Sequence, residues 1–125
     1  MQNVLIIVIA DDNYEFAKCI KTILKKDERF EIIGMATSDE EEMKLIQNGK
    51  PHIVITDLKK AGKYTSIKII EKFSNKKDKP IFFVISGSAT DYLKELIELK
   101  VRYYLSKPLN IKSLLDKINE IYDEI

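Results

Sequence analysis

Five polar side chains in this sequence have the types that phosphoryl chemistry requires. They are three aspartates, one serine and one lysine: Asp11, Asp12, Asp57, Ser86 and Lys107. Three carboxylates at one site would repel one another and would need a compensating positive charge. A hard Mg²⁺ ion would supply that charge, because it takes oxygen ligands and is typically held by one or two carboxylates together with phosphate oxygens. With Mg²⁺ and Lys107 present, the formal charges would cancel and the site could accept a phosphoryl group.

Phosphoryl transfer needs little from a protein beyond alignment and charge stabilisation. A metal ion, an ammonium group and a hydroxyl donor are therefore a sufficient set, and an aspartate can be the nucleophile that carries the acyl phosphate. Each residue alone also has an ordinary explanation. Asp12 could cap a helix, and Asp57 or Ser86 could begin a turn. Lys107 could be a solvated surface side chain.

Five apolar runs in the sequence predict five strands, and these strands would position the polar residues. The runs span residues 4–10, 31–36, 52–56, 81–85 and 101–105. The first is apolar on both faces, as in a central strand of a parallel sheet that helices cover on both sides. The second is weaker and is followed by Thr37 and Ser38, which favours an edge strand.

Helical periodicity between and after the runs predicts five helices. Apolar residues recur at helical spacing within residues 16–24, 43–46, 67–73, 93–99 and 111–125. Ser38 followed by Glu41 is a capping-box pattern at the start of the second helix. Asn110 is a cap candidate for the last helix.

Strands that alternate with helices over short connections imply an α/β fold, a doubly wound parallel sheet with right-handed crossovers. In such a sheet, ligands bind beyond the carboxyl ends of the strands, near the point where the strand order reverses. Asp11 and Asp12 follow the first strand, Asp57 the third, Ser86 the fourth and Lys107 the fifth. Four of the five strands therefore deliver a charged or hydroxyl group to one location.

Composition and charge limit the number of domains, the binding partners and the cellular location that can be expected. A chain of 125 residues with 45% hydrophobic content is expected to form one domain over residues 1–125. A formal charge of +1 gives no electrostatic reason for direct nucleic-acid binding or for attraction to an anionic membrane. The apolar run at residues 4–10 is too short to span a bilayer. The single Cys19 excludes an internal disulfide and fits a reducing cytosol, so we expect a cytoplasmic protein.

Charge is unevenly distributed along the chain. Lysines dominate residues 59–79, whereas residues 38–42 are acidic. We interpret both segments as solvated helix surfaces rather than as a docking patch.

Four motifs resemble one family, the receiver domains of two-component response regulators. They are IADDN at Ile9–Asn13, ITD at Ile55–Asp57, VISG at Val84–Gly87 and YYLSKPL at Tyr103–Leu109. Each stands at the strand where the family carries it, and the resemblance covers the whole chain. It implies a flavodoxin-like fold with strand order 2-1-3-4-5.

For the metal site, the resemblance implies that Asp57 is the phosphoacceptor and Asp12 a direct Mg²⁺ ligand, with Asp11 assisting. Asp57 would also contact the ion. The third protein ligand in the family is the backbone carbonyl two residues after the phosphoacceptor, which here belongs to Lys59.

For the phosphoryl group, the resemblance implies that Ser86 hydrogen-bonds one of its oxygens and that Lys107 pairs with it. Tyr104 matches an aromatic residue that changes rotamer on activation, although a tyrosine packed at the sheet edge is an equally ordinary explanation. The resemblance also implies a cis peptide bond between Lys107 and Pro108.

By resemblance, the domain is a signalling switch and not an enzyme. A sensor histidine kinase or a phosphotransfer protein would donate the phosphoryl group to Asp57. Phosphorylation would shift an existing equilibrium that reshapes the face formed by the fourth helix, fifth strand and fifth helix. That face could carry a dimer or effector contact, as in transcription regulation. We expect no effector domain within residues 1–125.

The loop after Asp57 departs from the family pattern. Met-Pro usually stands three and four residues after the phosphoacceptor, with Gly four residues later. Here those positions hold Lys60, Ala61 and Thr65. We expect Gly62 to supply the backbone freedom from a different place, with a changed loop and an altered start of the third helix.

The main alternative is a degenerate pseudo-receiver. Lys59 or Lys60 could fold back, place its ammonium in the metal position and pair with Asp57. The domain would then be a phosphorylation-independent interaction module, although the presence of all five site residues argues against it. Two enzyme classes are less favoured. Asp11 and Asp12 would repel a flavin phosphate, and Lys59 stands where an aspartyl phosphatase needs a second acid.

Overall fold

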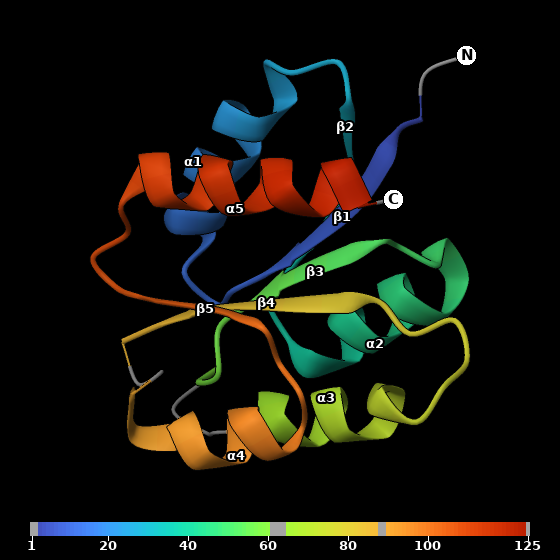
Figure 1. Ribbon diagram of the computed structural model, residues 1–125, viewed down its shortest axis with the longest axis vertical. Helices are drawn as coiled ribbons and strands as arrows, with labels where there is room; N and C mark the ends of the chain where they lie inside the picture. Colours follow the sequence, from blue (N-terminus) through green and yellow to red (C-terminus); the bar gives the residue numbers. More distant parts are fainter. Residues whose placement is uncertain (1–2, 61–64, 88–89, 125) are drawn as a thin grey trace.

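The computed structural model describes residues 3–60, 65–87 and 90–124 (Figure 1). Within these residues, five strands alternate with five α-helices, as the sequence predicts. The elements in chain order are β1 (Leu5–Ala10), α1 (Tyr14–Lys25), β2 (Phe30–Ala36), α2 (Asp39–Gly49), β3 (Ile53–Thr56), α3 (Ser66–Ser74), β4 (Ile81–Ser86), the 3₁₀ turn η1 (Thr90–Tyr92), α4 (Leu93–Glu98), β5 (Tyr103–Ser106) and α5 (Ile111–Glu124).

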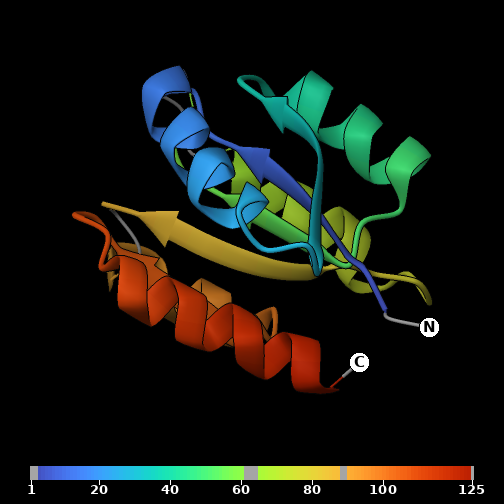
Figure 2. The ribbon, with the colours of Figure 1, turned by 90° about the horizontal axis from the view of Figure 1, so that it is seen from above.

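The strands form one parallel sheet in the order β2-β1-β3-β4-β5. The predicted doubly wound, flavodoxin-like order is therefore confirmed, and β2 lies at the edge. Figure 2 shows the strands twisted relative to one another, as the right-handed twist of each strand requires. The chain adds β2 on one side of β1 and β3 on the other. The order thus reverses between β1 and β3, whose carboxyl ends flank the position where such sheets bind ligands.

Helices cover both faces of the sheet, α1 and α5 on one face and α2, α3 and α4 on the other (Figure 1). Successive strand residues point into different layers. Ile7 belongs to the buried cluster of the first face with Ile20, whereas Val8 belongs to the cluster of the second face with Ile70. Burial on both faces explains why the strands appear in the sequence as continuous apolar runs. None of the helices in the described parts of the chain is both long and apolar enough to cross a membrane.

The predicted helix caps form at α2 and α5. Ser38 Oγ accepts a hydrogen bond from the Glu41 N–H at 3.3 Å, and Glu41 Oε1 accepts one from the Ser38 hydroxyl at 3.2 Å. Asn110 Oδ1 accepts from the Ser113 N–H at 3.0 Å. Local side-chain chemistry thus fixes where these two helices begin.

Three strands begin later than their apolar runs, β1 at Leu5, β3 at Ile53 and β5 at Tyr103. His52 precedes β3, and its Nδ1 accepts from the Ile6 N–H at 2.9 Å. Val101 precedes β5, because its N–H donates to the carbonyl of Leu96 in α4 at 2.9 Å. The sequence pattern also does not predict η1, the 3₁₀ turn that leads into α4.

Candidate functional site

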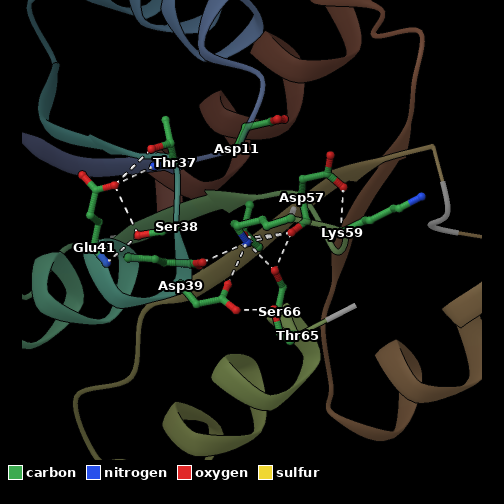
Figure 3. Close-up of polar contacts among 12 residues, drawn as sticks. Asp11, Thr37, Ser38, Asp39, Glu41, Asp57, Lys59, Thr65 and Ser66 are labelled. Carbon is green, nitrogen blue, oxygen red and sulfur yellow. Dashed lines mark hydrogen bonds and ion pairs between the residues drawn. The ribbon is translucent and has the colours of Figure 1, made fainter. Parts of the chain in front are cut away.

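The carboxyl ends of β1 and β3 bring three aspartates together. Asp11 and Asp12 follow β1, and Asp57 follows β3. One carboxylate oxygen from each lies within 4.8 Å of the others, with Asp11 and Asp57 buried and Asp12 exposed. Figure 3 shows Asp11 and Asp57 at this end of the sheet. A cluster of hard oxygen donors is the set that Mg²⁺ takes from proteins, so these residues fit that ion.

The start of α1 positions Asp11. Asp11 Oδ1 accepts a hydrogen bond from the Asn13 N–H at 2.9 Å. Asn13 in turn caps α1, because its Oδ1 accepts from the Phe16 N–H at 3.1 Å. The explanation of Asp12 as the helix cap is therefore wrong, and Asp12 instead belongs to the carboxylate cluster.

Lys107 brings a positive charge into the same cluster. Its Nζ lies 2.9 Å from Asp11 Oδ2 and 3.0 Å from Asp57 Oδ2. The ammonium also lies 4.2 Å from the centre of the Phe16 ring, a cation–π contact. The peptide bond between Lys107 and Pro108 is cis, as the resemblance implies. One ammonium thus bridges the residues that follow β1 and β3.

Burial and ion pairing have opposite effects on the pKa values of Asp11 and Lys107. Burial raises the pKa of Asp11 above its ordinary 3.8, although hydrogen bonds from Asn13 and Lys107 act against the rise. Burial would lower the pKa of Lys107, but its hydrogen bonds to Asp11 and Asp57 outweigh that effect and raise this pKa above 10.5. Lys107 therefore stays cationic, and its charge opposes the rise in the pKa of Asp11 without cancelling it.

Hydrogen bonds fix the backbone of Asp57 on both sides. Its N–H donates to the carbonyl of Ala10 in β1 at 3.0 Å. Its carbonyl oxygen accepts from Ser66 Oγ at 2.6 Å and from Lys60 Nζ at 2.9 Å. The carboxylate accepts from the Lys59 N–H at 3.2 Å. The main chain of Asp57 is thus held in place while its carboxylate faces Lys107.

The remaining candidates come from β4, β5 and the segment after β3. Ser86 is the last residue of β4 and is buried, and its carbonyl accepts from the Lys107 N–H at 3.2 Å. Tyr104 lies in β5 beside Val84 of β4, with 39% of its surface exposed. The side chain of Lys59 is exposed and extends away from the Asp57 carboxylate (Figure 3).

The sequence does not reveal the burial of Lys60. Only 3% of Lys60 is exposed, and its Nζ lies 3.0 Å from Oε1 of Glu42, which has no exposed surface. The interpretation of residues 38–42 and 59–79 as solvated surfaces is therefore wrong for these two side chains. Glu42 stands four residues before the buried Ile46, so both share one face of α2. That spacing is the one sequence signal of its burial.

Lys60 does not take the place that the pseudo-receiver alternative gives it. Its ammonium contacts Asp57 through the backbone carbonyl, whereas Lys107 makes the ion pair with the Asp57 carboxylate. Thr65, immediately before α3, donates a hydrogen bond to Asp39 Oδ2 at the start of α2. Gly62 lies outside the described residues, so its expected role stays a prediction.

Comparison with known proteins supports the resemblance. A family model described as the response regulator receiver domain matches residues 7–119. The uncharacterized transcriptional regulatory protein YesN of Bacillus subtilis (strain 168) is 35% identical over 95 residues, which make up 75% of this chain and 26% of that protein. The transcriptional regulatory protein CitT of the same organism is 24% identical over 103 residues, or 82% of this chain and 46% of that protein. The chain thus spans less than half the length of these two relatives.

Solved structures share the fold along nearly the whole chain. A CheY-like response regulator receiver domain protein from Methanospirillum hungatei JF-1 has a TM-score of 0.85 at 23% identity, covering 98% of this chain and 96% of that one. The REC domain of AraT, a response regulator from Geobacillus stearothermophilus, also has a TM-score of 0.85 at 23% identity, covering 97% and 95% of the two chains.

Proposed function

Because this chain belongs to the response regulator receiver domain family, we propose that it is a phosphorylation-dependent signalling switch in which Asp57 accepts the phosphoryl group. One observation carries the proposal. The carboxylates of Asp11, Asp12 and Asp57 converge within 4.8 Å, and the Lys107 ammonium bridges two of them. This arrangement combines a nucleophile, a metal-binding cluster and a cation for the incoming phosphoryl oxygens.

Asp57 acts as the nucleophile. One carboxylate oxygen bonds to phosphorus while the bond from phosphorus to the donor's histidine nitrogen breaks, and that nitrogen keeps the electron pair and takes up a proton. Asp11, Asp12, Asp57 and the backbone carbonyl of Lys59 would hold Mg²⁺, which supplies charge neutralisation for the phosphoryl oxygens. The donor is a sensor histidine kinase or a phosphotransfer protein.

Lys107 and Ser86 respond to the new group. Lys107 now pairs with Asp11 and Asp57, and after transfer it pairs with a phosphoryl oxygen. The Ser86 hydroxyl hydrogen-bonds another phosphoryl oxygen. A change of partners of this kind provides the differential interaction that a population shift requires.

The output surface is the face formed by α4, β5 and α5. Each element carries one exposed large apolar side chain, Ile97 at 59%, Tyr104 at 39% and Ile111 at 37% exposure. Exposed apolar side chains can take part in interaction surfaces, so we assign a dimer or effector contact to this face. A role in transcription regulation fits the names of YesN and CitT, with nucleic acid bound by another domain. We place this function in the cytoplasm.

Intact mass and NMR spectra recorded with Mg²⁺ and a small phosphodonor test this function. The wild type should gain one phosphoryl group, and the phosphate mimic beryllium fluoride should shift resonances around Asp57. Asp57→Asn should do neither, because an amide is a poor nucleophile. Asp116→Asn, a change of the same kind at an exposed position on α5, should match the wild type. An unchanged wild type would instead favour the phosphorylation-independent alternative.

A further inference from the structure

Lys60 is a buried cation behind the phosphoacceptor. Its Nζ donates to the Asp57 carbonyl at 2.9 Å and to Thr56 Oγ1 at 3.0 Å, and it also contacts Ser66 Oγ. Figure 3 shows Ser66 below Asp57, on the side away from the Asp57 carboxylate. Two ammonium groups therefore bracket Asp57, Lys107 at the carboxylate and Lys60 at the main chain.

Helix α2 supplies the counter-charge for Lys60. Glu42 Oε1 lies 3.0 Å from Nζ, and Asp39 Oδ1 lies 3.7 Å from it. Burial raises the pKa of Glu42, although the ammonium of Lys60 opposes the rise. Desolvation offsets most of the attraction in buried ion pairs, so apolar residues of similar volume often stabilise a fold equally well. Stability alone therefore explains this pair poorly.

The geometry of the loop indicates what Lys60 does instead. Its hydrogen bond to the Asp57 carbonyl closes the four-residue segment 57–60, as a main-chain hydrogen bond closes a β-turn. The segment also contains the Lys59 N–H, which donates to the Asp57 carboxylate at 3.2 Å. Both the carboxylate of Asp57 and the carbonyl of Lys59 therefore belong to a segment that Lys60 closes.

We propose that Lys60, anchored by Glu42, is a positioning residue that holds residues 57–60 so that the Asp57 carboxylate and the Lys59 carbonyl face the metal ion. This role rests on the proposed function, because the metal ion assists phosphorylation of Asp57. Lys60 Nζ contacts the main-chain carbonyl of Asp57, whereas Lys107 contacts its carboxylate, so Lys60 acts through the main chain of Asp57. Outer groups that orient metal ligands typically change metal affinity by 10–100-fold when they are removed.

The test separates positioning from stability. Lys60→Met should destabilise the fold, because it leaves Glu42 buried without its cation. The double variant E42M/K60M removes both charges at similar volume and should regain most of that stability. Its Mg²⁺ affinity should nevertheless stay about tenfold or more below that of the wild type. Lys68→Met removes a lysine charge at an exposed position on α3 and should leave both properties unchanged.

Two readouts complete the test, Mg²⁺ titration by calorimetry and the water-exchange rate of the Lys59 amide by NMR without metal. The amide should exchange faster in E42M/K60M than in the wild type and in Lys68→Met. Wild-type Mg²⁺ affinity together with wild-type exchange in the double variant overturns the proposal. If E42M/K60M does not fold, E42Q/K60M replaces it with the same two outcomes. A wild type that binds no Mg²⁺ would refute the proposed function, whereas the metal-free exchange rates still decide the role of Lys60.

Discussion

Lys107 forms ion pairs with two of the carboxylates that would hold a metal ion. Its ammonium contacts Asp11 Oδ2 at 2.9 Å and Asp57 Oδ2 at 3.0 Å, and both residues belong to the carboxylate cluster that fits Mg²⁺. In the metal-free protein, Lys107 reduces the repulsion between two buried acids. A metal ion bound to these carboxylates would neutralise them in its place, and Lys107 would then be free to pair with another group.

The variant Lys107→Ala should therefore respond more strongly to Mg²⁺ than the wild type does. Without metal, its free energy of unfolding should fall by about 1–3 kcal/mol, because two charge-assisted hydrogen bonds are lost and the carboxylates repel. Added Mg²⁺ should recover most of that loss through binding to the folded state. Urea unfolding with and without Mg²⁺ measures both effects.

Lys112 provides the control for Lys107. Its ammonium lies 3.2 Å from Asp116, but 86% of its side chain is exposed. Lys112→Ala should change stability by less than about 0.5 kcal/mol and should leave the response to Mg²⁺ unchanged. If Mg²⁺ raises the free energy of unfolding of Lys107→Ala and of the wild type by the same amount, Lys107 does not compete with Mg²⁺ for the carboxylates.

At the scale of elements, α2 and α3 are joined to the end of β3 by buried polar side chains. Glu42 extends from α2 to Lys60, and Ser66 donates from the start of α3 to the carbonyl of Asp57. The segment 57–60 that follows β3 is therefore connected to two helices on the face opposite α1 and α5. Any change in the protonation of Glu42 changes the charge inside that connection.

The pH dependence of stability should report the titration of Glu42. Burial raises its pKa above 4.5, opposed by Lys60, while the nearby Asp39 adds repulsion. Thr56 and Ser66, which also face the Lys60 ammonium, are neutral. A carboxyl whose pKa is raised by folding contributes stability that is full below 4.5 and is lost as pH rises through the folded-state pKa. The glutamine in Glu42→Gln does not titrate, so this variant should not show that loss of stability as pH rises.

Urea unfolding at a series of pH values, from below 4.5 to neutral, checks this expectation. The free energy of unfolding of the wild type should fall relative to that of Glu42→Gln as pH rises. Glu40→Gln changes an exposed acid in the same helix, so its profile should parallel that of the wild type. Parallel profiles for Glu42→Gln and the wild type would mean that folding does not raise the pKa of Glu42.

At the scale of the whole molecule, the sheet and the location of the site were predictable from the sequence. Strands buried on both faces produce apolar runs, and topology places the residues after these runs at one edge. The ion pair of Lys60 and Glu42 was not predictable. Each residue lies among other charged residues in the sequence, as solvent-facing residues do, and only the packing of α2 against β1, β2 and α3 shows that they are buried. The cap of α1 was also ambiguous, since Asp12 and Asn13 are adjacent residues that can both cap a helix.

Activation should alter association through the α4, β5 and α5 face. Ile97 is 59% exposed, so Ile97→Glu should change the free energy of unfolding by no more than about 0.5 kcal/mol. If this face joins two activated domains, the charge would weaken self-association of the beryllium fluoride form by about tenfold, which corresponds to roughly 1.4 kcal/mol. Sedimentation velocity with and without beryllium fluoride measures this self-association.

Val4→Glu is the control, because it places the same charge at a 43% exposed position beside β1. It should behave as the wild type. If both variants weaken self-association equally, the weakening comes from the change in net charge and not from this face.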